Sequence, residues 1–484
     1  MRVLMKNVMK RTMRGLLPYG TVFVIVLLLS GCDALLLRQY VPDESGFDGA
    51  VRVYKTSLDR HYGVVWVQVP YLDLEAQGRV GLAKMYVHRR DFTAKRPLPA
   101  LFHAHYEGDA AMAKAWCDRG WAVFSPMNTE AEGPFPLDAA IGNSHNLNRA
   151  IIQWIRRLPN IDRSRLHIHG ASQGGYMSLA MSADMFPVTA ATADYPVVNW
   201  AYNLTYVEAN RSIAFNPFGC AYSPLPSLCS VLFISNLSFA HFGNILADDV
   251  WLLLSPIAWL DRIANPVLVT AATGDMLTPI NQMSRVHVRP HDPDRFPPGY
   301  VNDFDALTLN EAARITFEEA LPPGGYYINV ITPDQASGDV QDKPWFAGVQ
   351  WNLLYLDEGP PQPNAGHTVL NWALFPESYT AHYKSVTPSE SILNAAKMRH
   401  LMERYTLTLS ALPHLADGRL GNRLNFPLLE KRDVLTGLLD YARLGATHRN
   451  LLISLYRNCP VQPFGPEITV ERLERELEAL LKAL

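Results

Sequence analysis

A serine between glycines is the first candidate for chemistry in this chain. The stretch G-A-S-Q-G, residues 170–174, places Ser172 in the pattern Gly-x-Ser-x-Gly. A serine hydroxyl is a weak nucleophile near pH 7, so it needs a base within hydrogen-bonding distance and a third group that orients the base. The pentapeptide occurs often by chance, and its meaning depends on the elements around it and on the acid and histidine elsewhere.

The residues on either side of Ser172 predict the strand and the helix that a nucleophile turn requires. Leu166–His169 is strand-like, and the chain from Tyr176 onward is helical in character. Glycines at the turn let strand and helix approach closely, and the helix N-terminus favours negative charge that develops nearby. We therefore interpret Ser172 as a nucleophile and the backbone N–H of Gln173 as one oxyanion donor.

An aspartate on a later loop is the candidate acid. Asp275 follows an apolar strand in the stretch 265–275, and Pro279 comes a few residues later. The plain alternative is a turn aspartate, because Gly-Asp is common in turns. Asp194, at the end of the preceding predicted strand, is the second candidate for the acid.

A loop histidine is the candidate base, because imidazole titrates near neutral pH. His367 is the first histidine after two stretches that compete for the role of the last strand, 324–332 and 350–358, and His382 is the fallback. The chain order is then nucleophile, acid, histidine.

Strands and helices alternate through the region that must position these groups. This alternation predicts βαβ units and a mostly parallel sheet that helices cover on both faces. We expect strands at 63–70, 80–88, 99–105, 121–126, 160–170, 188–196 and 265–275, and helices at 110–119, 148–159, 175–183 and 306–321. The last hundred residues are mainly helical in character.

Two stretches of the chain resemble the α/β-hydrolase superfamily. They are G-A-S-Q-G-G-Y-M-S-L-A, residues 170–180, and S-P-I-A-W-L-D-R-I-A-N-P-V-L-V-T-A-A-T-G-D, residues 255–275. The likeness is closest to its prolyl-oligopeptidase and acetyl-xylan-esterase-like branch. The resemblance implies an α/β-hydrolase fold and a Ser172, Asp275 and His367 triad. It also implies a second oxyanion donor from the loop after an early strand, where His105 or Tyr106 stands in place of the usual His-Gly pattern.

The resemblance also suggests how the chain divides. We expect a lipoprotein signal peptide at 1–31, a β-rich segment at 32–78, a catalytic domain at 79–386 and a helical region at 387–484. Two insertions interrupt the catalytic domain, and both break the strand–helix alternation. Residues 199–255 are rich in aromatic side chains and form either a cap over the site or a subdomain with its own core, and residues 284–350 form the second insertion.

Two His-x-His pairs offer a rival chemistry. His103 and His105 lie on one predicted strand, and His167 and His169 lie on another. Alternate residues share a strand face, so each pair could present two imidazoles to a metal. No carboxylate or cysteine accompanies the pairs at ligand spacing, so we predict no metal. No phosphate loop or dinucleotide fingerprint is present, so we also expect no cofactor.

The N-terminal residues predict export and a lipid anchor. A positively charged start and an apolar run, 21–29, lead into Leu-Ser-Gly-Cys, which ends at Cys32. This order resembles a bacterial lipobox, so we expect Cys32 to be acylated and to hold the protein on a membrane outside the cytoplasm. An exported compartment permits disulfides, and Cys220 and Cys229 bracket a loop that one could close.

Composition excludes several other classes. The chain has 484 residues, 48% hydrophobic and 18% charged, with a net charge of −3, so it is globular and presents no basic surface for nucleic acid. We predict a carboxylic ester hydrolase that acts through an acyl-enzyme on a small-molecule ester. The alternatives are a serine peptidase or amidase and a non-catalytic lipoprotein of the same fold. Fewer than about 75 residues separate Cys32 from the predicted oxyanion strand, too few for a propeller, which favours the ester.

Overall fold

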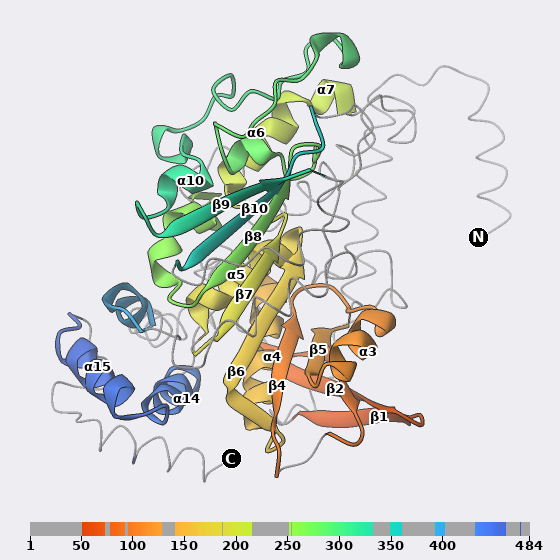
Figure 1. Ribbon diagram of the computed structural model, residues 1–484, viewed down its shortest axis with the longest axis vertical. Helices are drawn as coiled ribbons and strands as arrows, with labels where there is room; N and C mark the ends of the chain where they lie inside the picture. The colour runs from red at the N-terminus through yellow and green to blue at the C-terminus, as the bar shows by residue number, and fades with distance from the viewer. Residues whose placement is uncertain are drawn as a thin grey trace, which may run out of the picture.

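A computed structural model shows the arrangement of the chain (Figure 1). It describes residues 51–72, 78–91, 95–127, 141–185, 187–214, 251–252, 254–332, 349–360, 393–401, 431–460 and 475. Cys32, Cys220, Cys229, His367 and His382 lie outside these residues.

Ten strands of the described chain form a single sheet in the order β1-β2-β3-β5-β4-β6-β7-β8-β10-β9. The strands are β1 Arg52–Leu58, β2 Tyr62–Leu72, β3 Gly78–His88, β4 Leu98–His103, β5 Ala122–Pro126, β6 Ile161–Ala171, β7 Ala190–Asp194, β8 Val267–Ala272, β9 Tyr326–Ile331 and β10 Trp351–Leu356. The pairings among β1, β2, β3 and β5 in that order are antiparallel, and all pairings from β5 through β4 to β9 are parallel.

Helices cover both faces of this sheet. The α-helices are α3 Ala110–Asp118, α4 Ile141–Arg157, α5 Gln173–Asp184, α6 Trp200–Ala209, α7 Arg211–Ala214, α10 Phe317–Ala320, α14 Lys431–Ala442 and α15 Ala446–Arg457. The 3-10 turns are η6 Pro256–Ala258, η7 Leu260–Arg262, η8 Ile280–Gln282, η9 Pro293–Arg295 and η10 Glu311–Ala313. Apolar side chains of α4 and α5 pack on one face, and those of α3 pack on the other. The prediction of an α/β-hydrolase fold is confirmed.

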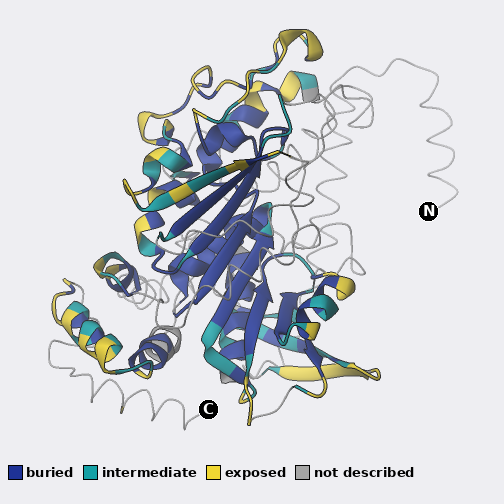
Figure 2. Cartoon of the chain, in the orientation of Figure 1, coloured by how far each residue is buried: buried dark blue, intermediate teal, exposed yellow. Residues whose placement is uncertain are grey.

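Most of the centre of the sheet is buried, although the first half of β6 is partly exposed (Figure 2). Every residue of β7, β8 and β10 is buried, as parallel strands between two helical layers require. The two ends of the sheet differ, because β1 and β9 carry partly exposed apolar residues such as Val53 and Tyr327. Among the described strands, only β1 and β9 have a side that pairs with no neighbouring strand. The turn after β6 lies at the centre of the sheet.

The strand β1 lies within the segment 32–78 that we expect to be β-rich, and it places the described residues before residue 79 in the same sheet as the residues after it. One helix departs from the predictions. The helix expected at 306–321 is instead two short turns, η10 and α10. Asn310 accepts a hydrogen bond from the backbone of Ala312, and Thr316 forms a capping box with Glu319, so each turn has a start of its own.

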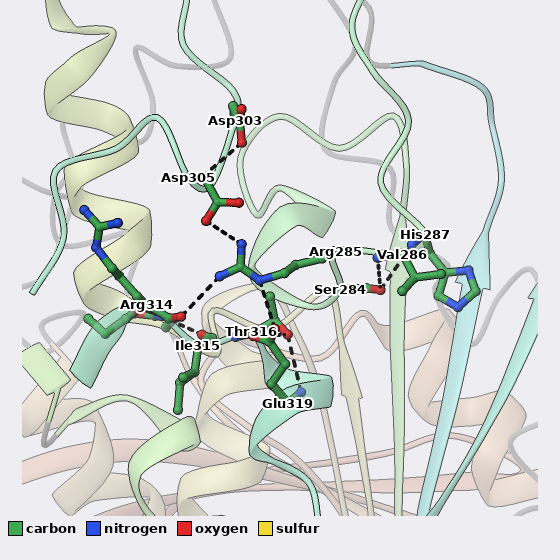
Figure 3. A network of polar contacts seen from close by, with 12 residues as sticks. Ser284, Arg285, Val286, His287, Asp303, Asp305, Arg314, Ile315, Thr316 and Glu319 are labelled. Atoms are coloured by element: carbon green, nitrogen blue, oxygen red, sulfur yellow. Dashed lines mark hydrogen bonds and ion pairs between the residues drawn. The ribbon is translucent and has the colours of Figure 1, made fainter. Parts of the chain in front are cut away.

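The second insertion is tied together by one arginine (Figure 3). Arg285 donates to Asp305 Oδ1 over 2.5 Å, to Glu319 Oε1 over 2.9 Å and to the Arg314 carbonyl over 3.2 Å. Its guanidinium also lies 4.6 Å from the ring centre of Phe304. Three segments of residues 284–320 are thereby held at a single side chain.

The aromatic side chains that begin the first insertion are buried in packing. Tyr202 stacks on Phe304 with ring centres 4.8 Å apart, and the hydroxyls of Tyr206 and Tyr300 lie 3.0 Å apart. Trp200 packs edge-on against Tyr176 of α5, 5.4 Å away. In the described part of residues 199–255, these rings connect the first insertion to the second and to α5.

The C-terminal helices dock on the end of α5 that lies farthest from the turn after β6. Lys397 Nζ donates to the Ser182 carbonyl over 2.5 Å and to the Ala183 carbonyl, which places a cation at the C-terminus of α5. Burial lowers the pKa of Lys397 to about 7, while the Asp184 charge opposes that shift. In Figure 1, α14 and α15 lie at this end of the molecule, and α6 and α7 lie at the opposite end.

Three further polar contacts link this end of α5, the helix α4 and the C-terminal helices. Asp184 Oδ1 lies 2.6 Å from His400 Nε2, and its Oδ2 lies 3.0 Å from His145 Nε2 of α4. Arg156 of α4 reaches Asp440 of α14, with 3.4 Å between Nη1 and Oδ2, and both side chains are buried. The C-terminal helices therefore contact the two helices that cover one face of the sheet.

No helix among the described residues combines the length and the apolar character that crossing a bilayer demands.

Candidate active site

The turn between β6 and α5 holds Ser172 in a strained backbone conformation. Its φ is 58° and its ψ is −121°, values that a non-glycine residue rarely adopts. The Ser172 N–H donates to the Asp194 carbonyl over 2.7 Å, which ties the turn to the end of β7. A Cβ at Gly174 would lie 2.7 Å from the Ala104 oxygen, and one at Gly175 would lie 2.6 Å from the Asp194 oxygen. Only glycine fits these two approaches, as expected for a nucleophile elbow.

The loop after β4 lies beside this serine. The Tyr106 hydroxyl and the Ser172 side chain form a hydrogen bond, and burial raises the pKa of Tyr106 above its usual value. The phenol therefore stays protonated near neutral pH and can donate to a negative oxygen. The structure thus brings Tyr106 and the predicted donor Gln173 to the same serine.

His105 has a different place in this loop. Its Nδ1 lies 2.7 Å from Ser144 Oγ of α4, and its side chain also bonds to Gln173. Burial lowers the pKa of His105 to about 4, so the ring is neutral near pH 7. Its φ of 71° is the second strained non-glycine angle at this edge of the sheet. His105 fixes the loop against α4 and α5, and the Tyr106 side chain reaches the serine.

A partly buried ion pair holds the loop from the other side. Lys84 of β3 pairs with Glu107, the residue after Tyr106. Asp109 then caps α3 by accepting from the backbone N–H groups of Ala111 and Met112, both over 3.0 Å. These contacts were not anticipated, because the partner of Glu107 lies on a strand that is distant in sequence.

Asp275 lies on the loop after β8, at the same carboxyl edge of the sheet as Ser172. Its Oδ1 accepts from the N–H groups of Leu277 and Thr278 over 2.8 and 3.0 Å, and its Oδ2 accepts from Thr278 Oγ1 over 2.8 Å. The side chain is buried. These donors fix the orientation of the carboxylate, which is what a triad acid requires.

The last described residues after β10 lie beside this loop. Both competing stretches are strands, and β10 lies between β8 and the edge strand β9. The Glu358 N–H, two residues beyond β10, donates to Thr273 Oγ1 over 2.9 Å. The chain therefore passes directly by the Asp275 loop before the described residues end at 360. The role of His367 stays a prediction.

The four histidines of the two His-x-His pairs do not converge on one point. His103 and His169 are paired across neighbouring strands, with their Nδ1 atoms 3.0 Å apart, and His169 Nε2 lies 3.1 Å from Asp194 Oδ2. His167 packs edge-on against Trp121, 4.6 Å away. Within the described part of the chain, no three histidine, cysteine or acidic side chains are grouped as metal ligands would be. The Asp194 carboxylate, the second candidate for the triad acid, is engaged inside the sheet.

A profile of the prolyl oligopeptidase family matches residues 149–216, the stretch from α4 through the Ser172 turn to α7. The matched residues include the Ser172 turn between β6 and α5. The family resemblance is therefore limited to residues 149–216, and the parallel sheet with the Ser172 turn has the arrangement of an α/β-hydrolase fold. No curated protein sequence matches the chain.

Several solved structures resemble this chain. The acetyl xylan esterase from Paenibacillus sp. R4 has 14% identity and a TM-score of 0.34, with 52% of this chain and 80% of that chain covered. Acetyl xylan esterase 1 from Thermoanaerobacterium sp. JW/SL YS485 has 13% identity and a TM-score of 0.35, with 72% and 93% covered. An acylaminoacyl peptidase in complex with Z-Gly-Gly-Phe-chloromethyl ketone has 12% identity and a TM-score of 0.38, with 70% and 50% covered. The chain therefore spans half the length of that peptidase.

Proposed function

We propose that this serine hydrolase cleaves carboxylic esters through an acyl-enzyme on Ser172. The observation that carries the proposal is the strained Ser172 turn, which Gln173 follows directly and which the Tyr106 side chain contacts. His367 removes the serine proton and returns it to the leaving alcohol, and Asp275 orients the imidazole. The Gln173 N–H and the Tyr106 hydroxyl stabilise the oxyanion of the tetrahedral intermediate.

A preference for esters over amides is part of the proposal. The described residues before β4 form strands β1, β2 and β3 of the catalytic sheet itself, so they are not blades of a propeller. A peptidase or amidase that acts on small peptides is the second candidate, because the profile that matches residues 149–216 belongs to a peptidase family.

The test compares short and long nitrophenyl esters with aminoacyl nitroanilides. Ester turnover that Ser172→Ala abolishes, with a lower rate on anilides, is the expected result. Ser164→Ala, at the opposite end of β6, is the matched serine control and keeps wild-type turnover. Faster anilide turnover supports the amidase. If the wild type shows no turnover and a fluorophosphonate does not label Ser172, both enzymatic proposals fail and a non-catalytic role remains.

The choice of the acid has its own test. Asp275→Asn is expected to lower kcat by about 10⁴-fold if Asp275 orients the histidine tautomer. Asp194→Asn removes the carboxylate that bonds His169 and Thr270, and it is the control for the second candidate acid. If Asp194→Asn lowers kcat by about 10⁴-fold and Asp275→Asn does not, Asp194 is the triad acid.

We also propose that Cys32 carries a lipid that anchors the enzyme to a bacterial membrane outside the cytoplasm. The support is the order of positive residues, apolar run and Leu-Ser-Gly-Cys in the sequence. Metabolic labelling with an alkyne fatty acid should mark the wild type and not Cys32→Ser, and the variant should leave the membrane fraction. Labelling of Cys32→Ser at wild-type levels would contradict the anchor.

A further inference from the structure

Four buried polar side chains form a continuous row across four neighbouring strands. His103 of β4 meets His169 of β6 with 3.0 Å between the Nδ1 atoms, and His169 Nε2 lies 3.1 Å from Asp194 Oδ2 of β7. Thr270 of β8 donates its hydroxyl to Asp194 Oδ1 over 3.0 Å. None of the four is more than 9% exposed. We call these four residues the polar row.

Each strand of the polar row leads to a group of the proposed active site. β4 reaches Tyr106 three residues after its row member, β6 reaches Ser172 three residues after its own, and β8 reaches Asp275 five residues after its own. β7 ends at Asp194, whose carbonyl accepts the Ser172 N–H. The row therefore joins the strands that carry the oxyanion loop, the nucleophile and the acid, just below the edge where these groups meet.

The chemistry of the row fixes the direction of its hydrogen bonds. The Asp194 carboxylate oxygen accepts, so His169 donates to it from Nε2. In the tautomer that carries its proton on Nε2, the His169 Nδ1 is an acceptor, and His103 donates to it from its own Nδ1. Burial and the neighbouring imidazoles lower the pKa of His103, so that ring is neutral. Every contact of the row then pairs one donor with one acceptor.

A directional contact constrains a strand differently from an apolar one. Apolar packing tolerates sliding, whereas a hydrogen bond weakens steeply when its length or angle changes. The backbone adds a second restraint at the same place, because the Ala104 N–H donates to the His169 carbonyl over 2.7 Å. The end of β4 is thus held to β6 by one side-chain contact and one backbone contact immediately before the oxyanion loop.

We propose that His103, His169 and Asp194 are positioning residues for the oxyanion hole. The row sets the register of β4 against β6 and thereby the position of the Tyr106 hydroxyl relative to Ser172. The inference rests on the proposed function, since it concerns the oxyanion hole of that reaction. A misplacement of about 1 Å at such a site lowers a rate by roughly 100-fold.

The test uses two substitutions of similar shape at the end of the row. In His103→Asn the amide can still donate to His169 Nδ1, and in His103→Leu nothing can. We expect His103→Leu to lower kcat for a nitrophenyl ester by about 10- to 100-fold with KM changed less than about threefold, and His103→Asn to retain most of kcat. A role in packing alone predicts the opposite order, because leucine suits a buried site better than asparagine.

Amide hydrogen exchange of residues 104–107 gives a readout that does not need turnover. Faster exchange there in His103→Leu, and near wild-type exchange in His103→Asn, is expected. If His103→Leu does not fold, Thr270→Val tests the other end of the row, and Thr270→Ser should restore whatever kcat the valine removes.

The two proposals fail in different ways. A wild type with no turnover and an unlabelled Ser172 refutes the proposed function, and the exchange of residues 104–107 then decides the inference. In an active enzyme, the inference is overturned if His103→Leu keeps both the kcat and the amide exchange of the wild type. It is also overturned if kcat is lower in His103→Asn than in His103→Leu.

Discussion

Replacing Gly174 by alanine tests the elbow and the oxyanion loop together. The new Cβ would lie 2.7 Å from the Ala104 oxygen, whereas ordinary contacts begin at 3.4 Å, so the two backbones must separate by about 0.7 Å. Neither side is a flexible side chain, and Ala104 leads directly to Tyr106. The shift of the Ala104 backbone therefore moves the oxyanion donor Tyr106 away from Ser172. We expect kcat to fall by about 10- to 100-fold, because a shift near 1 Å at a reacting centre has effects of that size.

The cost in folding stability is expected to be smaller than the cost in catalysis suggests. Overpacking destabilises by about 1–3 kcal/mol, and alanine in place of glycine within a helix returns about 1 kcal/mol. The assay is ester hydrolysis beside urea unfolding of the same preparation. Gly108→Ala is the control, since its Cβ would meet the movable end of Met112 at 3.1 Å. Wild-type kcat in Gly174→Ala, or an equal loss in Gly108→Ala, would refute the reasoning.

Three further outcomes follow from individual side chains. Tyr106→Phe removes an oxyanion donor and should lower kcat on a nitrophenyl ester by about 10²- to 10³-fold, and an unchanged kcat would remove the hydroxyl from the mechanism. Lys397, with its folded-state pKa lowered from 10.5 to about 7, binds fewer protons when folded than when unfolded between these pH values. The contribution of this group to the free energy of unfolding therefore rises with pH across that window and is lowest below it. Lys397→Met should flatten the dependence of the free energy of unfolding on pH, measured by urea titrations. An unaltered pH dependence would contradict the assignment. Arg285→Ala, which loses the contacts to Asp305 and Glu319, should lower the free energy of unfolding by about 1–2 kcal/mol, less in high salt, and a change that salt leaves untouched would argue against its ion pairs.

The centre of the fold could be predicted because its signals are local. β8 is a buried run that is apolar except for Thr270, and the strand, glycine turn and helix around Ser172 follow one another without a gap. The outer strand β1 was expected only as part of a β-rich segment, because a half-exposed strand at a sheet edge needs few apolar residues. The stretch 306–321 has helical composition, but Asn310 and Thr316 begin new turns inside it by bonding to backbone N–H groups.

The candidate site likewise combines residues that have local sequence signals with residues whose contacts depend on the strand order. Ser172 and Asp275 were found from motifs whose neighbours in sequence are also their neighbours in space. The His-x-His spacing drew attention to His103 and His169, but their pairing depends on β4 lying beside β6, which only the strand order decides. The role of Asp194 had no local signal either, since its partners come from the strands on both sides of it.

The contact of Lys397 with the end of α5 has a mechanical consequence. α5 has 12 residues and rises about 1.5 Å for each, so it is a rod about 18 Å long with Ser172 at one end and the C-terminal helices at the other. A helix buried along its length transmits a push with little bending. A displacement of residues 395–401 from the core would remove the Lys397 contact and act on the end of this rod that lies opposite Ser172.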